Sequence, residues 1–276
     1  MVDCRRVHNF IWEINEEAGV RITTQKDLED VATVHFKTLF LEERNNTIIS
    51  QMRVISHFPR FFSKEEGKKI VDHVLMDELR RTLVVFAKEK ISGLNIWPVD
   101  FFLHFFDVVS PNLLDTVKES KTKGNVRGSM NAIFIALIPK SNNPNSFNDF
   151  RPISRYNLVY KVISKIIDAC IKDKLSLCVL KEQFGFLSNM QILDSIDMAQ
   201  EKMHSIKIKW LALDLKINLA KAYDKLDWDF IKLILLQIGV SLETTNWILA
   251  CISFVNFSIL VNGSPSIFFR CLRGCR

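Results

Sequence analysis

The chain has 276 residues, a formal net charge of +6, 48% hydrophobic residues and 25% charged residues. This length is enough for a sizeable core, and 21 Phe with 5 Trp exclude an intrinsically disordered chain, because disordered segments are poor in aromatic residues. The charge is uneven: residues 1–100 hold 15 basic and 16 acidic side chains, whereas residues 101–276 hold 22 and 15. The basic second half indicates either a polyanionic partner such as nucleic acid or an ordinary solvated surface.

The first hundred residues are predicted to be largely helical. Thr24 and Asp27 form a plausible capped start before an apolar stripe, and Ser63–Glu66 has the form of a capping box. Asp77–Lys90 has amphipathic spacing. A break at Ile91–Asn95 precedes a Phe-rich helix, whose rings are expected to pack in the core.

The second half mixes strands and helices. Ile133–Ile138 predicts a strand that ends in a polar, Asn-rich turn, and a long helix is expected from about Tyr156 to Leu175. A further strand is predicted to open at Trp210–Leu213. Asp227 is placed to cap a helix that ends before Gly239.

No targeting, membrane or metal signal is expected. Met1–Arg6 is not followed by an apolar segment, so we predict no signal peptide and an intracellular protein, in the nucleus or cytoplasm. The six Cys are predicted to be reduced thiols, and neither they nor the six His show metal-site spacing. The uncharged segment Thr244–Phe269 is interrupted by polar residues before the roughly 20 apolar residues of a membrane span. We predict a short helix there, then a hairpin at Asn262-Gly263.

Lys140 and Arg151 stand at either end of the polar turn. If the flanking segments pair as a hairpin, both cations can reach one ligand, and Lys together with Arg is a usual way to neutralise a triphosphate. The alternative is that both are ordinary solvated charges of a hairpin.

A group of aspartates surrounds the segment Lys216–Trp228, namely Asp214, Asp224, Asp227 and Asp229. Polymerase chemistry needs carboxylates at a strand end that hold two Mg²⁺ about 4 Å apart. The alternative for Asp227 and Asp229 is that they only begin a helix, where the helix dipole favours negative charge.

Six blocks in order resemble the reverse transcriptase of plant non-LTR (LINE-type) retrotransposons: Phe134–Lys140, Asn148–Ser154, Tyr160–Lys165, Glu182–Phe186, Leu219–Asp224 and Leu260–Ser266. The resemblance extends upstream through Asn9–Trp12, Gln25–Glu29 and Ser56–Phe62. It implies an RNA-directed DNA polymerase with fingers, palm and thumb, which uses Mg²⁺, dNTPs and an RNA or DNA template–primer. By resemblance, Lys140 and Arg151 grip the incoming triphosphate, and Tyr223 lies under the sugar.

The sequence departs from the family at several positions. The first metal-binding Asp of the family is replaced by Asn218, a neutral ligand where Mg²⁺ prefers carboxylate oxygen. Asp214 would lie about 13 Å away along an extended strand, too far to hold the same ion. Met190 replaces a usually basic residue, and Lys90–Trp97 lacks most turn-forming residues of the corresponding loop. The sequence also ends before the family's paired-aspartate strand and thumb.

We therefore predict an α+β fold, with a helical linker and fingers extension at 1–125 and a reverse transcriptase domain of fingers and incomplete palm at 126–276. The expected function is that of a truncated, degenerate and catalytically inactive reverse transcriptase fragment with no cofactor of its own. The alternatives are a non-catalytic nucleic-acid-binding protein and a helical interaction module. The sequence leaves the oligomeric state open.

Overall fold

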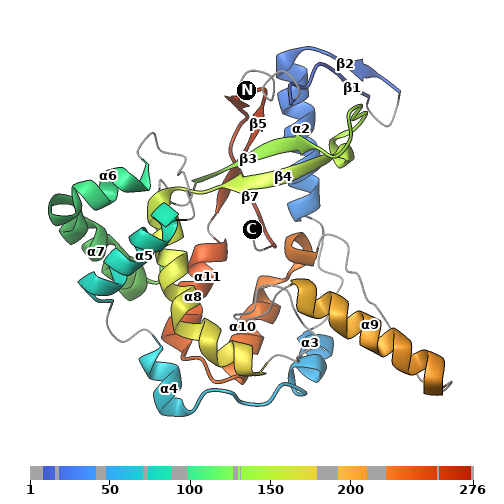
Figure 1. The fold of residues 1–276 in the computed structure, drawn as a ribbon. Coiled ribbons are helices and arrows are strands. Elements are labelled where there is room, and N and C mark those ends of the chain that lie inside the picture. The colour runs from blue at the N-terminus through green and yellow to red at the C-terminus, as the bar shows by residue number, and fades with distance from the viewer. Residues whose placement is uncertain are drawn as a thin grey trace.

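The computed structural model describes residues 9–15, 19–41, 48–70, 74–88, 98–126, 130, 132–178, 192–209, 222–253 and 255–274. The fold is α+β, as predicted, with a small sheet at one end and a helical body at the other (Figure 1). The helices are α2 (Gln25–Leu41), α3 (Ile48–Ile55), α4 (Lys64–Lys69), α5 (Met76–Lys88), α6 (Val99–His104), α7 (Phe106–Lys123), α8 (Leu158–Cys178), α9 (Ile192–Lys209), α10 (Trp228–Gln237) and α11 (Leu242–Ser253). Two 3-10 helices are η1 (Phe147–Asp149) and η2 (Ala222–Lys225).

The strands of the described residues form two sheets. β1 (Ile14–Asn15) and β2 (Arg21–Ile22) make a short ribbon. The larger sheet has the order β4-β3-β5-β6, with β7 also paired to β5, from strands β3 (Ala132–Pro139), β4 (Phe150–Arg155), β5 (Asn256–Val261), β6 (Ser264–Pro265) and β7 (Phe269–Arg270). β3 and β4 are antiparallel, whereas β3 and β5 are parallel, with Ile135 opposite Ile259. β5, which comes more than 100 residues after the β3–β4 hairpin in the sequence, is thus its neighbour in the sheet.

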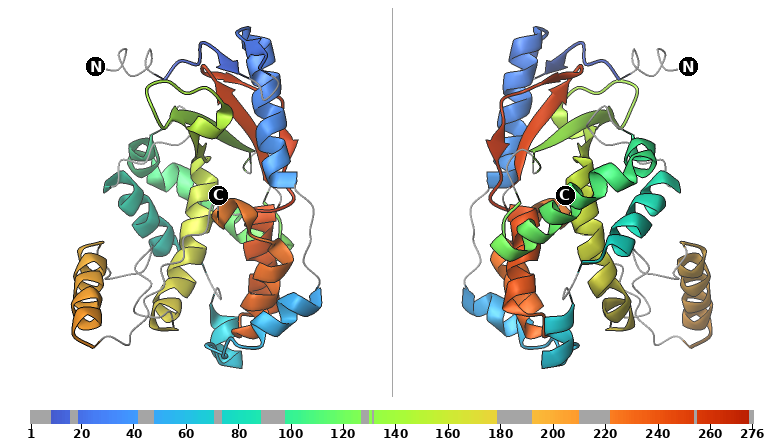
Figure 2. Two further views of the ribbon diagram at one scale, coloured as in Figure 1. Left: turned by 90° about the vertical axis from the view of Figure 1, so that its right-hand side faces the viewer. Right: turned by 90° about the vertical axis from the view of Figure 1, so that its left-hand side faces the viewer.

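One face of the sheet is covered by α2 (Figures 1 and 2). Leu28, Ala32, Phe36 and Phe40 recur at helical spacing and are buried in one cluster with the β3 and β5 side chains that face them. Phe40 stacks on Phe257 with ring centroids 5.2 Å apart. The covered face therefore depends on a helix from the first 41 residues.

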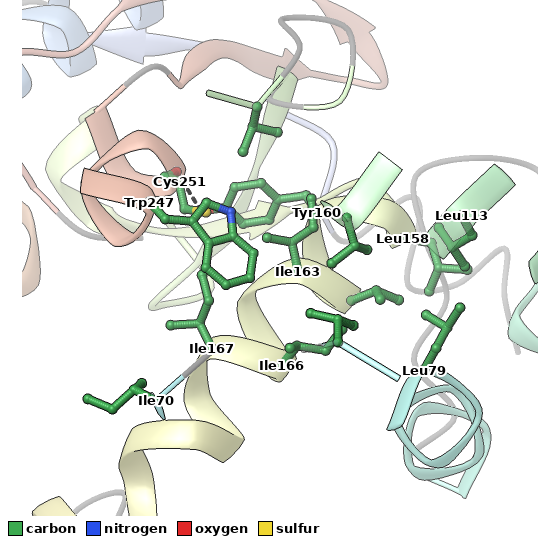
Figure 3. Close-up of a cluster of buried hydrophobic side chains, with 14 of the residues drawn as sticks. Ile70, Leu79, Leu113, Leu158, Tyr160, Ile163, Ile166, Ile167, Trp247 and Cys251 are labelled. Atoms are coloured by element: carbon green, nitrogen blue, oxygen red, sulfur yellow. Dashed lines mark hydrogen bonds between the residues drawn. The ribbon is translucent and has the colours of Figure 1, made fainter. Parts of the chain in front are cut away.

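The helical body has its own apolar core, centred on α8 (Figure 3). Ile163 and Ile166 are fully buried on its inner face, and Trp247 of α11 packs beside them. The Tyr160 hydroxyl donates to the Cys251 carbonyl over 2.8 Å, so a polar group in this core is satisfied. The two clusters share Tyr156 as a partly buried neighbour.

Local signals in the sequence located several element ends correctly. Ser63 and Glu66 form the predicted capping box, and Asp227 accepts from the backbone of Asp229 and Phe230. Asn262 and Gly263 turn the chain between β5 and β6, both with positive φ. The Phe-rich segment is split in two: Phe106 is buried, whereas Phe105 is 46% exposed, so the prediction of core packing holds for only part of it.

The predicted boundary at 125/126 stays a prediction, as does the assignment of fingers and palm. Both apolar clusters contain residues from either side of that position. Among the described residues, no helix is long and apolar enough to cross a membrane.

Candidate functional site

The β3–β4 hairpin places Lys140 and Arg151 on one face. Ile138 is opposite Arg151, and Lys140 N donates to Asp149 O over 2.8 Å, which continues the ladder one residue beyond β3. Opposite residues of an antiparallel pair share a face, and so do residues two apart on one strand. Lys140 and Arg151 are therefore diagonal neighbours. The segments on either side of the polar turn do pair as a hairpin, which is the condition for both cations to reach one ligand.

The loop between the strands is fixed by Asp149. One carboxylate oxygen accepts from the backbone N–H groups of Ser146 and Asn145, over 2.9 and 3.0 Å, and from the Ser146 hydroxyl. These hydrogen bonds, those from Ser146 and Asn145 above all, hold the pKa of Asp149 below its ordinary value. At the mouth of the loop, the Lys140 ammonium donates to the Asn148 carbonyl over 2.6 Å.

Lys140 and Arg151 line a cavity of about 350 Å³ between the hairpin and α2. We call it the cation pocket; its lining comprises His35, Phe36, Leu39, Lys140, Phe147, Asn148, Phe150, Arg151, Pro152, Ile153 and Asp224. The walls are aromatic and aliphatic, whereas the charges are two cations and one carboxylate. A pocket with this balance is suited to an anion that also has an apolar portion.

Asp224 enters the pocket from η2 and is 3% exposed. Its position is fixed by the last described residues: Gly274 N donates to Leu226 O over 2.8 Å, and Trp228 Nε1 donates to Gly274 O over 2.8 Å. Arg273 donates from Nε and from a terminal nitrogen to Leu39 O at the end of α2, over 3.2 and 2.9 Å. The segment before Gly274 thus ties η2 to α2 beside the pocket.

The remaining predicted site residues are placed differently. Tyr223 is 55% exposed, and its neighbour Asp224, rather than Tyr223 itself, is among the described residues that line the pocket. Asn218 lies outside the described residues, as do the segments at Lys90–Trp97 and Glu182–Met190. Asp224 is among the candidate carboxylates predicted from the sequence. No sequence pattern groups it with Lys140 and Arg151, which are distant in the chain.

Two further cations lie beyond the pocket, Arg155 at the end of β4 and Lys161 near the start of α8. Arg155 is exposed on the same face of β4 as Arg151, since the two are four residues apart in one strand. Lys161, near the start of α8, has a lowered pKa because burial disfavours its charge and because Arg155 is close enough to repel it. Arg155 and Lys161 are therefore close to one another beyond the pocket.

The donor set of the pocket does not fit Mg²⁺. A divalent cation of this kind is usually held by carboxylate oxygens, and the pocket offers one carboxylate beside two positive side chains. In the described part of the chain, no group of three or more His, Cys, Asp or Glu side chains is arranged to hold a metal ion.

The chain matches no protein-family model. It is 24% identical over 170 residues to "Transposon TX1 uncharacterized 149 kDa protein" of Xenopus laevis, a stretch covering 61% of the chain. The similarity supports a transposon-related origin. The matched part spans 13% of the length of that relative.

Proposed function

We propose that the chain is a fragment of a LINE-type reverse transcriptase that binds nucleotides and nucleic acid through the cation pocket and lacks polymerase activity. The observation that carries the proposal is the position of Lys140 and Arg151, two predicted triphosphate ligands that line one pocket on one face of a hairpin. The six ordered sequence blocks and the similarity to a transposon protein support the same origin.

The charges of the pocket favour a phosphate ligand. Arg151 offers a planar fork of donors that matches two phosphate oxygens, whereas Lys140 offers a compact charge already oriented by Asn148. Apolar walls from α2 and the hairpin leave room for the sugar or base of a nucleotide beside the charged groups. Arg155 and Lys161 extend the positive surface, as a bound template–primer would require.

The proposed lack of activity rests on Asn218. An amide at this position removes one unit of negative charge from the ligands that the family uses for Mg²⁺. The two metals supply most of the electrostatic stabilisation in phosphoryl transfer, so nucleotide binding without them does not lead to incorporation.

Binding of a fluorescent dTTP analogue to the full chain at low salt tests the pocket. Lys140→Ala and Arg151→Ala are each expected to weaken binding about tenfold, since a hydrogen bond to a charged group is worth about 1.5–3 kcal/mol. Lys118→Ala is the matched control, because Lys118 is an exposed lysine on α7 outside the pocket. Equal affinities for all four proteins would contradict the proposal.

Primer extension on poly(rA) with Mg²⁺ tests the absence of catalysis. No incorporation above the buffer background is expected from the full chain. Incorporation that disappears in Arg151→Ala would show that the pocket is part of a working polymerase, and the proposed inactivity would then be wrong.

A further inference from the structure

A second concave surface shares the residue Phe150 with the cation pocket. It is a groove of about 660 Å³. One wall is residues 9–13 and the other is the hairpin loop, with Asn142, Asn143 and Asn145. We call it the aromatic groove.

Two aromatic rings are presented to solvent in this groove. Phe10 is 41% exposed and Trp12 is 69% exposed, with ring centroids 4.4 Å apart, while Ile11 between them is buried. In an extended segment alternate side chains point to the same side, which explains this pattern. Large exposed aromatic faces are unusual for a segment whose neighbours are anchored in a core, and they leave π surface available to a planar ligand.

The backbone of the segment that carries Phe10 and Trp12 is held in place by hydrogen bonds. Ile11 N donates to Asn262 Oδ1 over 2.7 Å, and Asn262 Nδ2 donates back to Ile11 O over 3.0 Å. Ile11 and Ile14 are both part of the cluster beneath the sheet. A ligand that stacks on Trp12 therefore meets a backbone that is already ordered, which lowers the entropic penalty of binding.

The opposite wall is held in place as well. Asn15 N donates to Asn145 O over 2.9 Å, and Asn145 N donates to the Asp149 carboxylate. The side chains of Asn142 and Asn143 are exposed on this loop. An amide offers both donors and acceptors without charge, which is the chemistry that pairs with the edge of a nucleobase rather than with a phosphate.

We propose that the aromatic groove stacks unpaired bases of a single-stranded nucleic acid on Phe10 and Trp12. This inference rests on the proposed function, because the shared wall at Phe150 lets one strand place a phosphate at Lys140 and Arg151 and a neighbouring base in the groove. Aromatic side chains with adjacent cations are the usual elements of single-strand recognition. Glu13, which lines the groove, forms an ion pair with Arg21, so its negative charge is partly neutralised.

The experiment compares two labelled ligands that differ only in their bases. Fluorescence anisotropy measures binding of the full chain to a dT oligonucleotide and to an oligomer of abasic sites with the same number of phosphates. Trp12→Ala is expected to weaken binding to the dT oligonucleotide about tenfold, since stacking of a base is worth about 1–3 kcal/mol, and to leave the abasic oligomer unaffected. Trp12→Phe retains an aromatic face and is expected to recover most of the affinity.

Phe58→Ala is the matched control, because Phe58 is an exposed aromatic residue outside the groove. Circular dichroism checks that each variant is folded. Equal losses for dT and abasic ligands in Trp12→Ala, or no loss for either, would overturn the stacking site. The proposal would also be overturned if Trp12→Ala weakened the binding of a proline-rich peptide and left the affinity for the dT oligonucleotide unchanged.

Arg151→Ala separates the groove from the function on which it rests. If Trp12→Ala selectively weakens dT binding while Arg151→Ala changes neither ligand, the groove stands and the cation pocket fails. If Arg151→Ala weakens both ligands equally while Trp12→Ala has no effect, the pocket stands and the groove is refuted.

Discussion

The side chain of Asn262 forms two hydrogen bonds with the backbone of Ile11, accepting from its N–H and donating to its carbonyl. The same amide also donates to Gln25 Oε1 over 3.0 Å. Asn262 has φ of 54°, a conformation that Asn tolerates better than most residues. One residue therefore both turns the β5–β6 hairpin and holds the segment that carries Phe10 and Trp12.

Asn262→Gly retains the turn and removes the side-chain bonds. Loss of the two bonds to Ile11 is expected to lower the free energy of unfolding by about 1–3 kcal/mol, because each contributes about 0.5–1.5 kcal/mol net. Asn262→Ala should lower it further, since Ala is also strained at positive φ. Urea unfolding measures the stability of both variants. An unchanged midpoint in Asn262→Gly would show that the hydrogen bonds from Asn262 to Ile11 contribute nothing to stability.

Gly274→Ala should disturb the carboxylate of the cation pocket. Gly274 has φ of 93°, and an added Cβ would lie 2.9 Å from the backbone oxygen of Asp224. Gly263→Ala is the matched control, because Gly263 has φ of 90° but nothing within 4 Å of the added atom. We expect Gly274→Ala to be the more destabilising by about 1 kcal/mol or more and to alter nucleotide affinity. Equal losses of stability in the two variants would show that the contact between residue 274 and the Asp224 backbone has no effect.

The loop at Asp149 should respond to acid. The folded-state pKa of Asp149 is below the ordinary value of 3.8, so the unfolded chain binds the proton more readily. Its contribution to stability is then fully present above about pH 4–5 and is lost as the pH falls through the folded-state pKa. The difference in stability between the wild type and Asp149→Ala should therefore be constant near neutrality and shrink below about pH 4.

Asp149→Asn provides the control for that experiment. The three hydrogen bonds from Asn145 and Ser146 to the Asp149 side chain all end on one carboxylate oxygen, and an amide oxygen can take its place without titrating. This variant should retain more of the loop's stability than Asp149→Ala at pH 7. If the difference between the wild type and Asp149→Ala does not change on acidification, Asp149 does not act through its charge.

Ser120 and Trp247 test the helical core. Trp247 is completely buried, and its indole N–H donates to Ser120 Oγ over 3.1 Å. Ser120→Ala leaves that N–H without this acceptor and should cost about 1–3 kcal/mol. Thr116→Ala, which removes a partly exposed hydroxyl that donates to Asn112 O within the same helix, should change stability by about 0.5 kcal/mol or less. Thermal unfolding followed at 222 nm measures both.

The parts of this fold that were predictable are those set by neighbours in the sequence. The Asn-Gly turn, the Ser63 capping box and the Asp227 cap depend on residues within a few positions of one another, so a single stretch of sequence specifies them. The diagonal placement of Lys140 and Arg151 follows in the same way from a short loop and the two-residue period of a strand.

The rest of the candidate site depends on contacts between distant segments. Nothing in the pattern around Phe36 indicates that α2 forms a wall of the pocket, and nothing around Gly274 indicates that it fixes Asp224. An amphipathic stripe predicts that a helix buries one face, but it does not name the surface that covers it. The bonds from Asn262 to Ile11 were unpredictable for the same reason.

The packing of α2 on β5 also has a consequence during synthesis. β5 leaves the ribosome about 200 residues after α2, which corresponds to roughly 10–40 s at the usual rate of elongation. Throughout that interval Phe40 lacks Phe257, the β5 ring on which it stacks. Until β5 emerges, this part of the α2 face is uncovered, and it is a natural substrate for chaperones that bind exposed hydrophobic segments.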